Sequence, residues 1–397
     1  MTRQVCQLLI TAMRIGINAH LLSPEQNYRA AGVSNYTEHL LRGLAHIDTH
    51  NHYYLSTGSW ARDRTKRHLF GLGRNFHWNA SQLPTQRSLL RILWEQSIWP
   101  IQCNRLDVVH SMLNVLPLWR VGRAARVVTI HDLAFLLFDD KHSPAQRRYL
   151  EISTRAAVRR AERIIAVSEN TRQDILRLLH VSPDKVVTIS EAAGSEFAPL
   201  PSAEVEAFRA RRALPNRFFF YLGTLEPRKN IPALLRGYAL MRQQEPNAPV
   251  LIIAGPKGWL YDEIFTLVRE LQLEPFVSFP GFIPRDELAL WFNAALCFIY
   301  LSEYEGFGLP PLQAMACGIP PIINNASSLP EVVGDAGILV NVHDLADVAG
   351  SLRRMACDEA KRLELGQKAL ERSHTFSWQR AARETLKIYQ AVHAEAR

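Results

Sequence analysis

The sequence predicts an α/β protein of two doubly wound, Rossmann-like domains that face each other across a central cleft. The chain has 397 residues, a length that suits two domains of somewhat under 200 residues each. Short β-rich runs alternate with helix-length stretches, which is the order of a parallel sheet with crossover helices. The alternation stops at a segment dense in Pro and small residues, 191–215, and then starts again.

The first half of the chain carries the first set of elements. Its β-rich runs are Arg14–Asn18, 107–110, Ala125–Ile130 and 164–167, and an amphipathic helical run covers 36–45. Residues 1–12 precede the first strand pattern and are interpreted as an extension. We predict that residues 1–195 form one Rossmann-like domain.

The second half repeats this order. Its β-rich runs are Phe218–Leu222, Val250–Ala254, 277–279, Cys297–Tyr300, 319–323 and 337–340, with a helical run at Ile231–Gln244. We predict a second domain over 196–376 and a last helix, 377–397, that crosses back to the first domain. Open α/β sheets bind ligands at the carboxyl ends of their strands, so we expect a shared cleft there.

Composition argues against several protein classes. The five cysteines contain no CxxC pair, so we expect reduced thiols and neither a disulfide framework nor a zinc site. The longest apolar runs are strand-sized and far below the ~20 residues of a membrane span. The first residues lack the pattern of a signal peptide. We therefore expect a cytoplasmic protein.

Positive charge is concentrated in the first half. Residues 1–200 hold 25 Lys and Arg against 16 Asp and Glu, whereas residues 201–397 hold 21 against 22. A basic first half suits an anionic partner. Nucleic acid is disfavoured because no Lys-rich tract or aromatic RNA-binding signature accompanies the charge. An anionic membrane surface, contacted peripherally from its inner face, or a lipid diphosphate fits better; an ordinary basic surface is the alternative.

The most informative segment is EGFGLPPLQAMACG at 305–318, which follows the strand run Cys297–Tyr300. Its glycines form a turn that leads into a helix, and free N–H groups at a helix N-terminus suit a diphosphate. A carboxylate at Glu305 would repel phosphate, so we expect it to accept hydrogen bonds from sugar hydroxyls. The alternative is a structural turn whose glycines only permit positive φ.

This segment resembles the signature of the retaining glycosyltransferases of family 4, which have the two-domain GT-B fold. The resemblance implies that the first domain binds the acceptor and the second a nucleotide sugar. The family pattern has two glutamates with seven residues between them; this sequence has Glu305 at the first position and Gln313 at the second, where the family binds the nucleotide ribose. The further donor-binding candidates that the turn implies are Gly306, Phe307, Gly308 and Leu309.

A second segment, YLGTLEPRKN at 221–230, is similar to the same family. Two adjacent cations between a strand and a helix can neutralise a diphosphate leaving group. The resemblance implies that Arg228 and Lys229 contact the donor phosphates. Many members carry an arginine where this chain has Thr224, which is a donor-binding candidate here. Without the family context, a solvated helix start is the alternative for both cations.

The first half contributes two further candidates. The run 127–133 contains His131 at the end of a strand, where the family places a histidine beside the donor sugar. The resemblance implies that His131 is a binding and transition-state group and not a nucleophile; a structural histidine is the alternative. The turn before 36–45 resembles the family's first Gly-rich loop and retains Gly32, which is implied to lie near the diphosphate and acceptor.

Three other stretches have two interpretations each. Ser168 and Thr171 match the family and also suit a helix cap. The loop 327–331 could cap a helix or touch ligand. The run 87–99, rich in Leu, Ile and Trp with basic flanks, suits either lipid contact or a core helix.

The resemblance implies a retaining hexosyltransferase, which we expect to be metal-independent. The GTLEPRKN form is similar to members that transfer mannose or rhamnose, so GDP-mannose is our first donor and UDP-linked sugars are the alternative. We expect the acceptor to be a hydroxyl of a saccharide or lipid-linked saccharide in polysaccharide or glycolipid assembly. No Asp-x-Asp occurs, so we expect no metal and no cofactor beyond the nucleotide sugar. The alternatives are a nucleotide-sugar epimerase or hydrolase and a degenerate nucleotide-sugar-binding protein.

Overall fold

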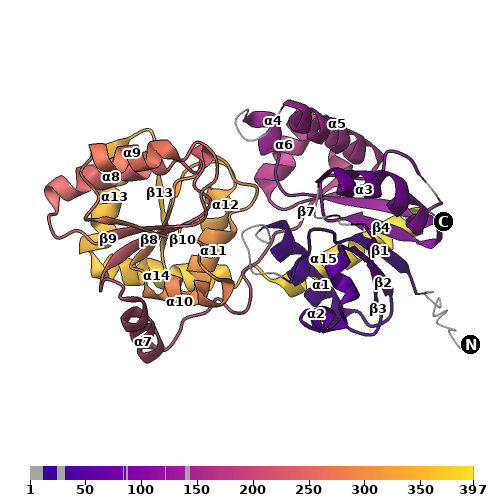
Figure 1. Ribbon diagram of the computed structural model, residues 1–397, viewed down its shortest axis with the longest axis horizontal. Helices are drawn as coiled ribbons and strands as arrows, with labels where there is room; N and C mark the ends of the chain where they lie inside the picture. The colour runs from indigo at the N-terminus through magenta and orange to yellow at the C-terminus, as the bar shows by residue number, and fades with distance from the viewer. Residues whose placement is uncertain are drawn as a thin grey trace, which may run out of the picture.

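The computed structural model of the chain describes residues 12–24, 32–83, 85, 88–120, 122–138 and 144–396. It contains two parallel sheets, each within its own α/β domain, and the two domains lie next to each other (Figure 1). The predicted fold class of two Rossmann-like domains is confirmed. Most of the expected N-terminal extension, 1–11, lies outside the described residues.

The first domain is built on a seven-stranded sheet of order β3-β2-β1-β4-β5-β6-β7, with every neighbouring pair parallel. Its strands are β1 (Arg14–Asn18), β2 (His52–Thr57), β3 (Phe76–Ala80), β4 (Val108–Ser111), β5 (Ala125–Ile130), β6 (Arg163–Ala166) and β7 (Val186–Thr188). The strands β2, β3 and β7 are additions to those that the sequence predicts.

The second domain is built on a six-stranded sheet of order β10-β9-β8-β11-β12-β13, again parallel throughout. Its strands are β8 (Phe218–Leu222), β9 (Val250–Ala254), β10 (Val277–Gly281), β11 (Cys297–Tyr300), β12 (Pro321–Asn324) and β13 (Ile338–Val340). Three of the sequence-predicted runs coincide with β8, β9 and β11, and the other three overlap β10, β12 and β13 with ends that differ by one or two residues.

The helices connect successive strands and cover both faces of each sheet. In the second domain, α8, α9 and α13 lie above the sheet and α10 and α14 below it (Figure 1). The helices are α1 (Val33–Ile47), α2 (Arg64–His68), α3 (Ser88–Gln102), α4 (Ala134–Leu137), α5 (Pro144–Arg160), α6 (Glu169–Leu179), α7 (Ser202–Arg212), α8 (Ile231–Gln244), α9 (Asp262–Glu270), α10 (Leu288–Ala294), α11 (Leu309–Ala316), α12 (Leu329–Val333), α13 (Leu345–Cys357), α14 (Glu359–Ser373) and α15 (Trp378–Glu395).

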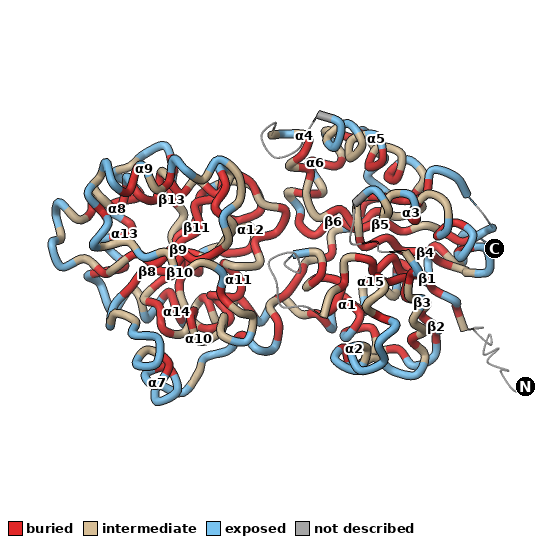
Figure 2. Tube along the Cα trace, in the orientation of Figure 1, coloured by how far each residue is buried: buried red, intermediate tan, exposed pale blue. Residues whose placement is uncertain are grey.

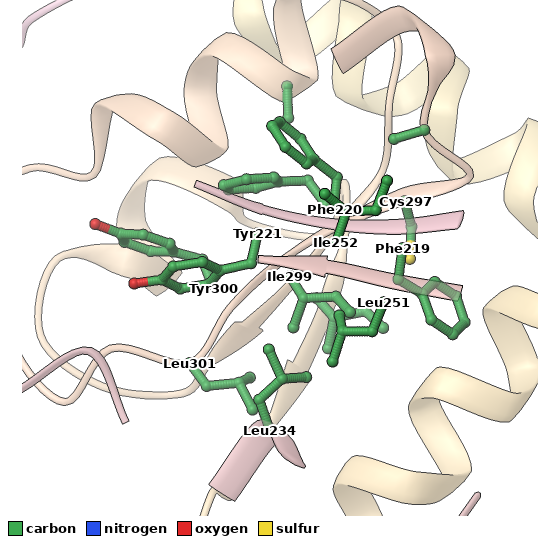
Figure 3. Close-up of a cluster of buried hydrophobic side chains, with 14 of the residues drawn as sticks. Phe219, Phe220, Tyr221, Leu234, Leu251, Ile252, Cys297, Ile299, Tyr300 and Leu301 are labelled. Atoms are coloured by element: carbon green, nitrogen blue, oxygen red, sulfur yellow. The ribbon is translucent and has the colours of Figure 1, made fainter. Parts of the chain in front are cut away.

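The strands of the second domain can be predicted from the sequence because they form its buried core. β8 has the sequence FFFYL and β9 has VLIIA, and both are almost wholly buried because helices cover both faces of a parallel sheet. Buried residues follow the strands in both domains, whereas exposed residues lie on the outer helix faces and loops (Figure 2). Within this core, the hydroxyls of Tyr221 and Tyr300 point together to one side (Figure 3).

The strand order reverses at one point in each sheet, between β1 and β4 in the first domain and between β8 and β11 in the second. Neighbouring connections leave in opposite directions there, which opens a crevice at the carboxyl ends of the two central strands. The loops 223–230 and 301–308 meet at the second of these points. The sequence-predicted Arg228, Lys229 and Glu305 all lie on these two loops.

The last helix ties the two halves of the chain together. α15, at the yellow end of the chain, packs against α1 of the first domain (Figure 1). Its Tyr389 hydroxyl lies 2.7 Å from His110 Nδ1 in the core of that domain. Among the helices described, none is both long and apolar enough to cross a membrane.

Candidate active site

A buried cluster of charged side chains lies at the β8–β11 crevice. Lys229 and Arg228 end the short helix η5 (Pro227–Lys229), and Glu305 follows β11 on the facing loop. The Lys229 ammonium contacts the Glu305 carboxylate and donates to the Tyr300 hydroxyl at 2.7 Å. The Arg228 guanidinium lies 3.3 Å from the Glu305 carboxylate and 2.7 Å from the Glu226 carboxylate. The sequence therefore identified three residues that the structure brings into direct contact.

The positive and negative side chains of this cluster compensate each other's charge. Arg228 and Lys229 face the carboxylates Glu305 and Glu226, and the side chains of Arg228, Lys229 and Glu305 are only 12, 9 and 13% exposed. An anionic ligand that bound the cations would have to exchange places with these carboxylates. Glu226 was not among the predicted site residues, although it stands two positions before Arg228 in the same motif.

Burial and ion pairing act against each other on these groups. Burial opposes ionisation of Glu305, but the charges of Lys229 and Arg228 outweigh it and hold the pKa of Glu305 at about 2. Burial lowers the pKa of Lys229, and the adjacent Glu305 counteracts part of that shift. Burial also disfavours the Arg228 cation, yet Glu305 and Glu226 raise its pKa above the usual value. We infer that Glu305 and Arg228 are ionised at neutral pH.

Two serines hold the turn that carries Glu305. Ser327 Oγ accepts from the Glu305 N–H at 3.1 Å and donates to the Glu305 carbonyl at 2.7 Å. Ser328 Oγ donates to the Phe307 carbonyl at 2.8 Å. The loop 327–331 thus holds in place the turn that carries Glu305.

The turn then enters α11 through Gly308, whose φ of 109° lies in the region that favours glycine. Two prolines follow Leu309, and proline has no N–H to donate. The Leu312 N–H already bonds to the Gly308 carbonyl at 3.3 Å. The backbone donors that this helix start can offer a diphosphate are therefore those of Gly308 and Leu309.

His131 lies directly across from this turn. A Cβ atom at Gly306 would overlap the His131 carbonyl oxygen, so only glycine allows the two backbones to approach this closely. The imidazole Nδ1 lies 3.4 Å from Glu191, and Nε2 lies 3.0 Å from the Met112 carbonyl. Tyr36 contacts the ring edge-on, with centroids 4.7 Å apart. Glu191, which orients this histidine, lies 60 positions away in the chain and gave no sequence signal.

The remaining predicted residues lie around the cluster. Thr224 is half-buried beside Gly258, on the neighbouring loop after β9. Phe307 is buried and joins the hydrophobic core of the first domain. Gln313 is 9% exposed and lines a small cavity with Leu309 and Arg285. Gly32 begins α1 with a φ of 66° and faces open space. Within the described part of the chain, neither Gly32 nor Gln313 forms a hydrogen bond or ion pair with the charge cluster.

A cavity of about 1200 Å³ opens between the domains. α1, from Ser34 to His46, forms one wall, and the loop after β10 forms another; segments 193–200 and 373–379 also contribute to the lining. Arg285 crosses the cavity and pairs with Glu38 at 2.8 Å and with Glu196 at 3.0 Å. The charge cluster lies outside the lining of this cavity.

Comparison with known proteins places this architecture among glycosyltransferases. Residues 204–372 match the family model for glycosyl transferases group 1, and residues 30–192 match that for glycosyltransferase family 4. The O-antigen chain mannosyltransferase B of Escherichia coli is 33% identical over 295 residues, 74% of this chain and 77% of that protein. The serotype-specific mannosyltransferase WbdA of Escherichia coli is 34% identical over 262 residues, which are 64% of this chain but only 32% of WbdA.

Solved structures share the fold at lower identity. A sucrose-phosphate synthase from Thermosynechococcus elongatus superposes with a TM-score of 0.77 at 21% identity, over 97% of this chain and all of that chain. WaaG, a glycosyltransferase involved in lipopolysaccharide biosynthesis, superposes with a TM-score of 0.71 at 13% identity, over 94% of this chain and 99% of that one.

Proposed function

We propose an activity for this chain from one premise: it belongs to glycosyltransferase family 4, the glycosyl transferases group 1, and has the GT-B fold. The chain transfers mannose from GDP-mannose to a hydroxyl of a saccharide or lipid-linked saccharide, with retention of anomeric configuration. The observation that carries this proposal is the buried cluster of Arg228, Lys229 and Glu305 at the β8–β11 crevice.

Mannose and a polysaccharide acceptor are supported by the relatives. The proteins at 33–34% identity are mannosyltransferases, and one is described as an O-antigen chain enzyme. The YLGTLEPRKN motif supports the same sugar class through its likeness to mannosyl- and rhamnosyltransferases. UDP-linked sugars are the alternative donors.

In the proposed reaction, Arg228 and Lys229 bind the diphosphate of the donor. The diphosphate replaces Glu305 as their partner, and the released carboxylate accepts hydrogen bonds from sugar hydroxyls. The bond between the sugar C1 and the diphosphate oxygen breaks as the acceptor oxygen attacks C1 from the same face. The acceptor proton passes to the departing diphosphate oxygen. Two cations in a water-poor site stabilise the negative charge that develops on this leaving group.

His131 completes the proposed site from the first domain. Its ring is held by Glu191 and the Met112 carbonyl, and its backbone touches Gly306 of the donor turn. We assign it to contact with the transferred sugar at the transition state. No step in this scheme requires a protein nucleophile, a metal or a cofactor beyond the nucleotide sugar.

Thermal denaturation with GDP, UDP, ADP, TDP and their sugars, without added metal, is the first test. Stabilisation by GDP and GDP-mannose, lost in Lys229→Ala but kept in the exposed control Lys361→Ala, is expected. Turnover is then followed with labelled GDP-mannose and a mannoside acceptor, and the product anomer by NMR. No stabilisation by any nucleotide supports a degenerate binding protein, and acceptor-independent consumption supports an epimerase or hydrolase. Either result would overturn the proposal.

We also assign a peripheral contact with an anionic membrane to the first domain. The helix α3 buries Trp94 and Trp99 in the core, so the core-helix interpretation is correct for that face. Its other face exposes Leu89, Leu93 and Ile101 by 81, 56 and 63%. The adjacent Leu118 and Trp119, hydrogen-bonded to Gln96, expose a further 44 and 46%.

The charges around this apolar face favour lipid as the partner. Exposed arginines flank it at 105, 120 and 123. The only acidic residues between positions 81 and 125 are Glu95, which is buried, and Asp107, which pairs with Arg14. Arg87 lies outside the described residues. Apolar side chains beside basic ones suit an anionic membrane interface.

Co-sedimentation with vesicles that contain an anionic phospholipid tests this contact. The Leu89→Ser and Leu93→Ser pair should release the protein from vesicles and leave transfer to a water-soluble acceptor unchanged. Leu363→Ser, a change of an equally exposed leucine on α14, is the matched control and should bind as the wild type does. Equal binding by all three proteins would contradict the assignment.

A further inference from the structure

The residues on both sides of Glu305 are anchored on the other domain. The Tyr304 hydroxyl donates to Asp174 at 2.9 Å and accepts from the Leu133 N–H at 3.2 Å. The Gly306 carbonyl accepts from Ser168 Oγ at 2.5 Å and from Thr171 Oγ1 at 2.9 Å. A site residue of the second domain therefore sits between two attachment points on the first.

The backbone of Tyr304 contacts the charge cluster within the second domain. Its carbonyl accepts a hydrogen bond from the Arg228 guanidinium and another from Ser302 Oγ at 3.2 Å. The Arg228 carbonyl accepts from the Glu303 N–H at 2.9 Å. One residue thus contacts the first domain with its side chain and positions Arg228 with its main chain.

Because the Tyr304 hydroxyl is buried, loss of its hydrogen bonds would be energetically unfavourable. Tyr304 and Asp174 are each 6% exposed. The Phe138 ring packs against the Tyr304 ring, with the two ring centroids 5.8 Å apart. Burial raises the pKa of Tyr304 well above its usual value, so the hydroxyl keeps its proton and donates a hydrogen bond to Asp174. If the domains separated, both groups would return to water and the turn would lose its fixed attachment.

We propose that Tyr304 is a positioning residue that couples closure of the two domains to the geometry of Arg228 and Glu305. This inference rests on the proposed function, since it assigns the cluster to the donor. Open domains leave the cluster on a turn that is held from one side only. Closed domains fix that turn at Tyr304 and Gly306, so that leaving-group stabilisation is complete only when the acceptor domain is in place.

The test is Tyr304→Phe, which keeps the ring and removes the hydroxyl. We expect kcat for mannosyl transfer to fall roughly 10-fold to 100-fold, while the Kd for GDP changes less than about threefold. Tyr238→Phe is the matched control, because Tyr238 is a buried tyrosine whose hydroxyl bonds to the Pro249 carbonyl within the second domain. It should leave kcat unchanged.

Hydrogen exchange at the domain interface is a second measurement, which reports closure of the two domains without requiring turnover. The backbone N–H groups of Glu169 and Asn170 donate to Glu331 across the domain interface, at 2.8 and 2.9 Å. Tyr304→Phe should accelerate their hydrogen exchange, whereas Tyr238→Phe should not. Unchanged exchange or unchanged kcat in Tyr304→Phe would overturn the proposal.

A third variant pair separates coupling from a general loss of stability. Asp174→Asn keeps an acceptor for the Tyr304 hydroxyl and should retain kcat within about threefold of the wild type. Asp174→Leu should match Tyr304→Phe, and the double variant should be no worse than either single one. Additive losses would contradict the coupling. If the wild type transferred no sugar, the proposed function would fail, but the exchange result would still decide whether Tyr304 holds the domains together.

Discussion

The two domains place different chemistry at the same topological position. In the second domain, the loops after β8 and β11 bring together Arg228, Lys229 and Glu305, all of them charged. In the first, the end of β1 and the loop after it carry Asn18 and His20, and β4 ends at Ser111, all of them uncharged at neutral pH. The strand order around the two crevices is identical, 3-2-1-4 in local numbering, so topology alone does not determine what each crevice binds.

The first crevice is polar and buried. Asn18 Nδ2 donates to Glu95 on α3 at 3.3 Å, and His20 Nδ1 lies 2.9 Å from Thr85 Oγ1. Burial lowers the pKa of His20 to about 3, with a contribution from Arg91, so the imidazole is neutral at physiological pH. Its Nε2 meets no hydrogen-bond partner within the described part of the chain.

Strand order places a crevice in each sheet, and the side chains around that crevice set the charge that a ligand would meet. Paired cations suit an anionic diphosphate, whereas neutral donors and acceptors suit sugar hydroxyls. This division agrees with a donor on the second domain and an acceptor on the first. It also predicts that the two crevices will respond differently to pH and to substitution.

Acid should destabilise the first domain before the second. His20 and His110 both have pKa values lowered to about 3 by burial. The unfolded chain binds a proton on each below about pH 6.5, so stability falls as pH drops from 6.5 toward 3, by roughly 2 kcal/mol for each histidine at pH 5. Glu305, with a pKa of about 2, loses its contribution only from about pH 4.5 downward. Thermal denaturation between pH 7.5 and 4 checks this, and a midpoint unchanged down to pH 5 would contradict it.

Lys229→Ala should have the largest effect on catalysis. It removes one of two cations from the leaving group and leaves Glu305 paired with Arg228 alone. Loss of one such contact costs about 2–4 kcal/mol of transition-state stabilisation, or roughly 30-fold to 1000-fold in kcat/KM. Steady-state kinetics with GDP-mannose measures it. A loss below tenfold would remove Lys229 from the proposed leaving-group contacts.

Glu95→Gln should act on the acceptor and spare the donor. The change removes the charge that faces Arg91 at 3.9 Å and alters the partner of Asn18. Glutamine keeps an acceptor for Asn18 but makes the hydrogen bond a neutral one, which costs about 1–1.5 kcal/mol, so KM for the acceptor should rise roughly 5-fold to 13-fold. The Kd for GDP, measured by calorimetry, should stay constant. A changed GDP affinity would break the proposed division between the two crevices.

Gln313→Glu should give the smallest effect. A carboxylate at this position can accept from both hydroxyls of a ribose, and charged acceptors form stronger hydrogen bonds than neutral ones. We expect GDP binding to tighten by about 1 kcal/mol, roughly fivefold. Calorimetry with GDP checks this. Weaker binding would show that Gln313, nearly buried beside Leu309 and near Arg285, serves a different contact.

The sequence by itself determined the fold class and the chemistry of the second crevice. The strands β8, β9 and β11 are continuous apolar runs because both sheet faces are covered, and the charged residues follow them at once in the chain. Local order therefore placed the two loops at the carboxyl edge of the sheet, and the resemblance to family 4 singled out Arg228, Lys229 and Glu305 on them. The strands β2 (HYYLST) and β3 (FHWNA) escaped this reasoning because polar residues and histidines interrupt them.

Only the tertiary structure decided how the two halves of the site meet. The contacts of Tyr304 with Asp174 and of Gly306 with Ser168 join residues 130 and 138 positions apart. The partner of His131 is Glu191, which lies in a linker-like segment with no motif of its own. Such pairs depend on how one folded domain docks on the other, and no periodicity or local spacing encodes that geometry. The sequence thus determined the chemical groups, and domain docking determined which of them act together.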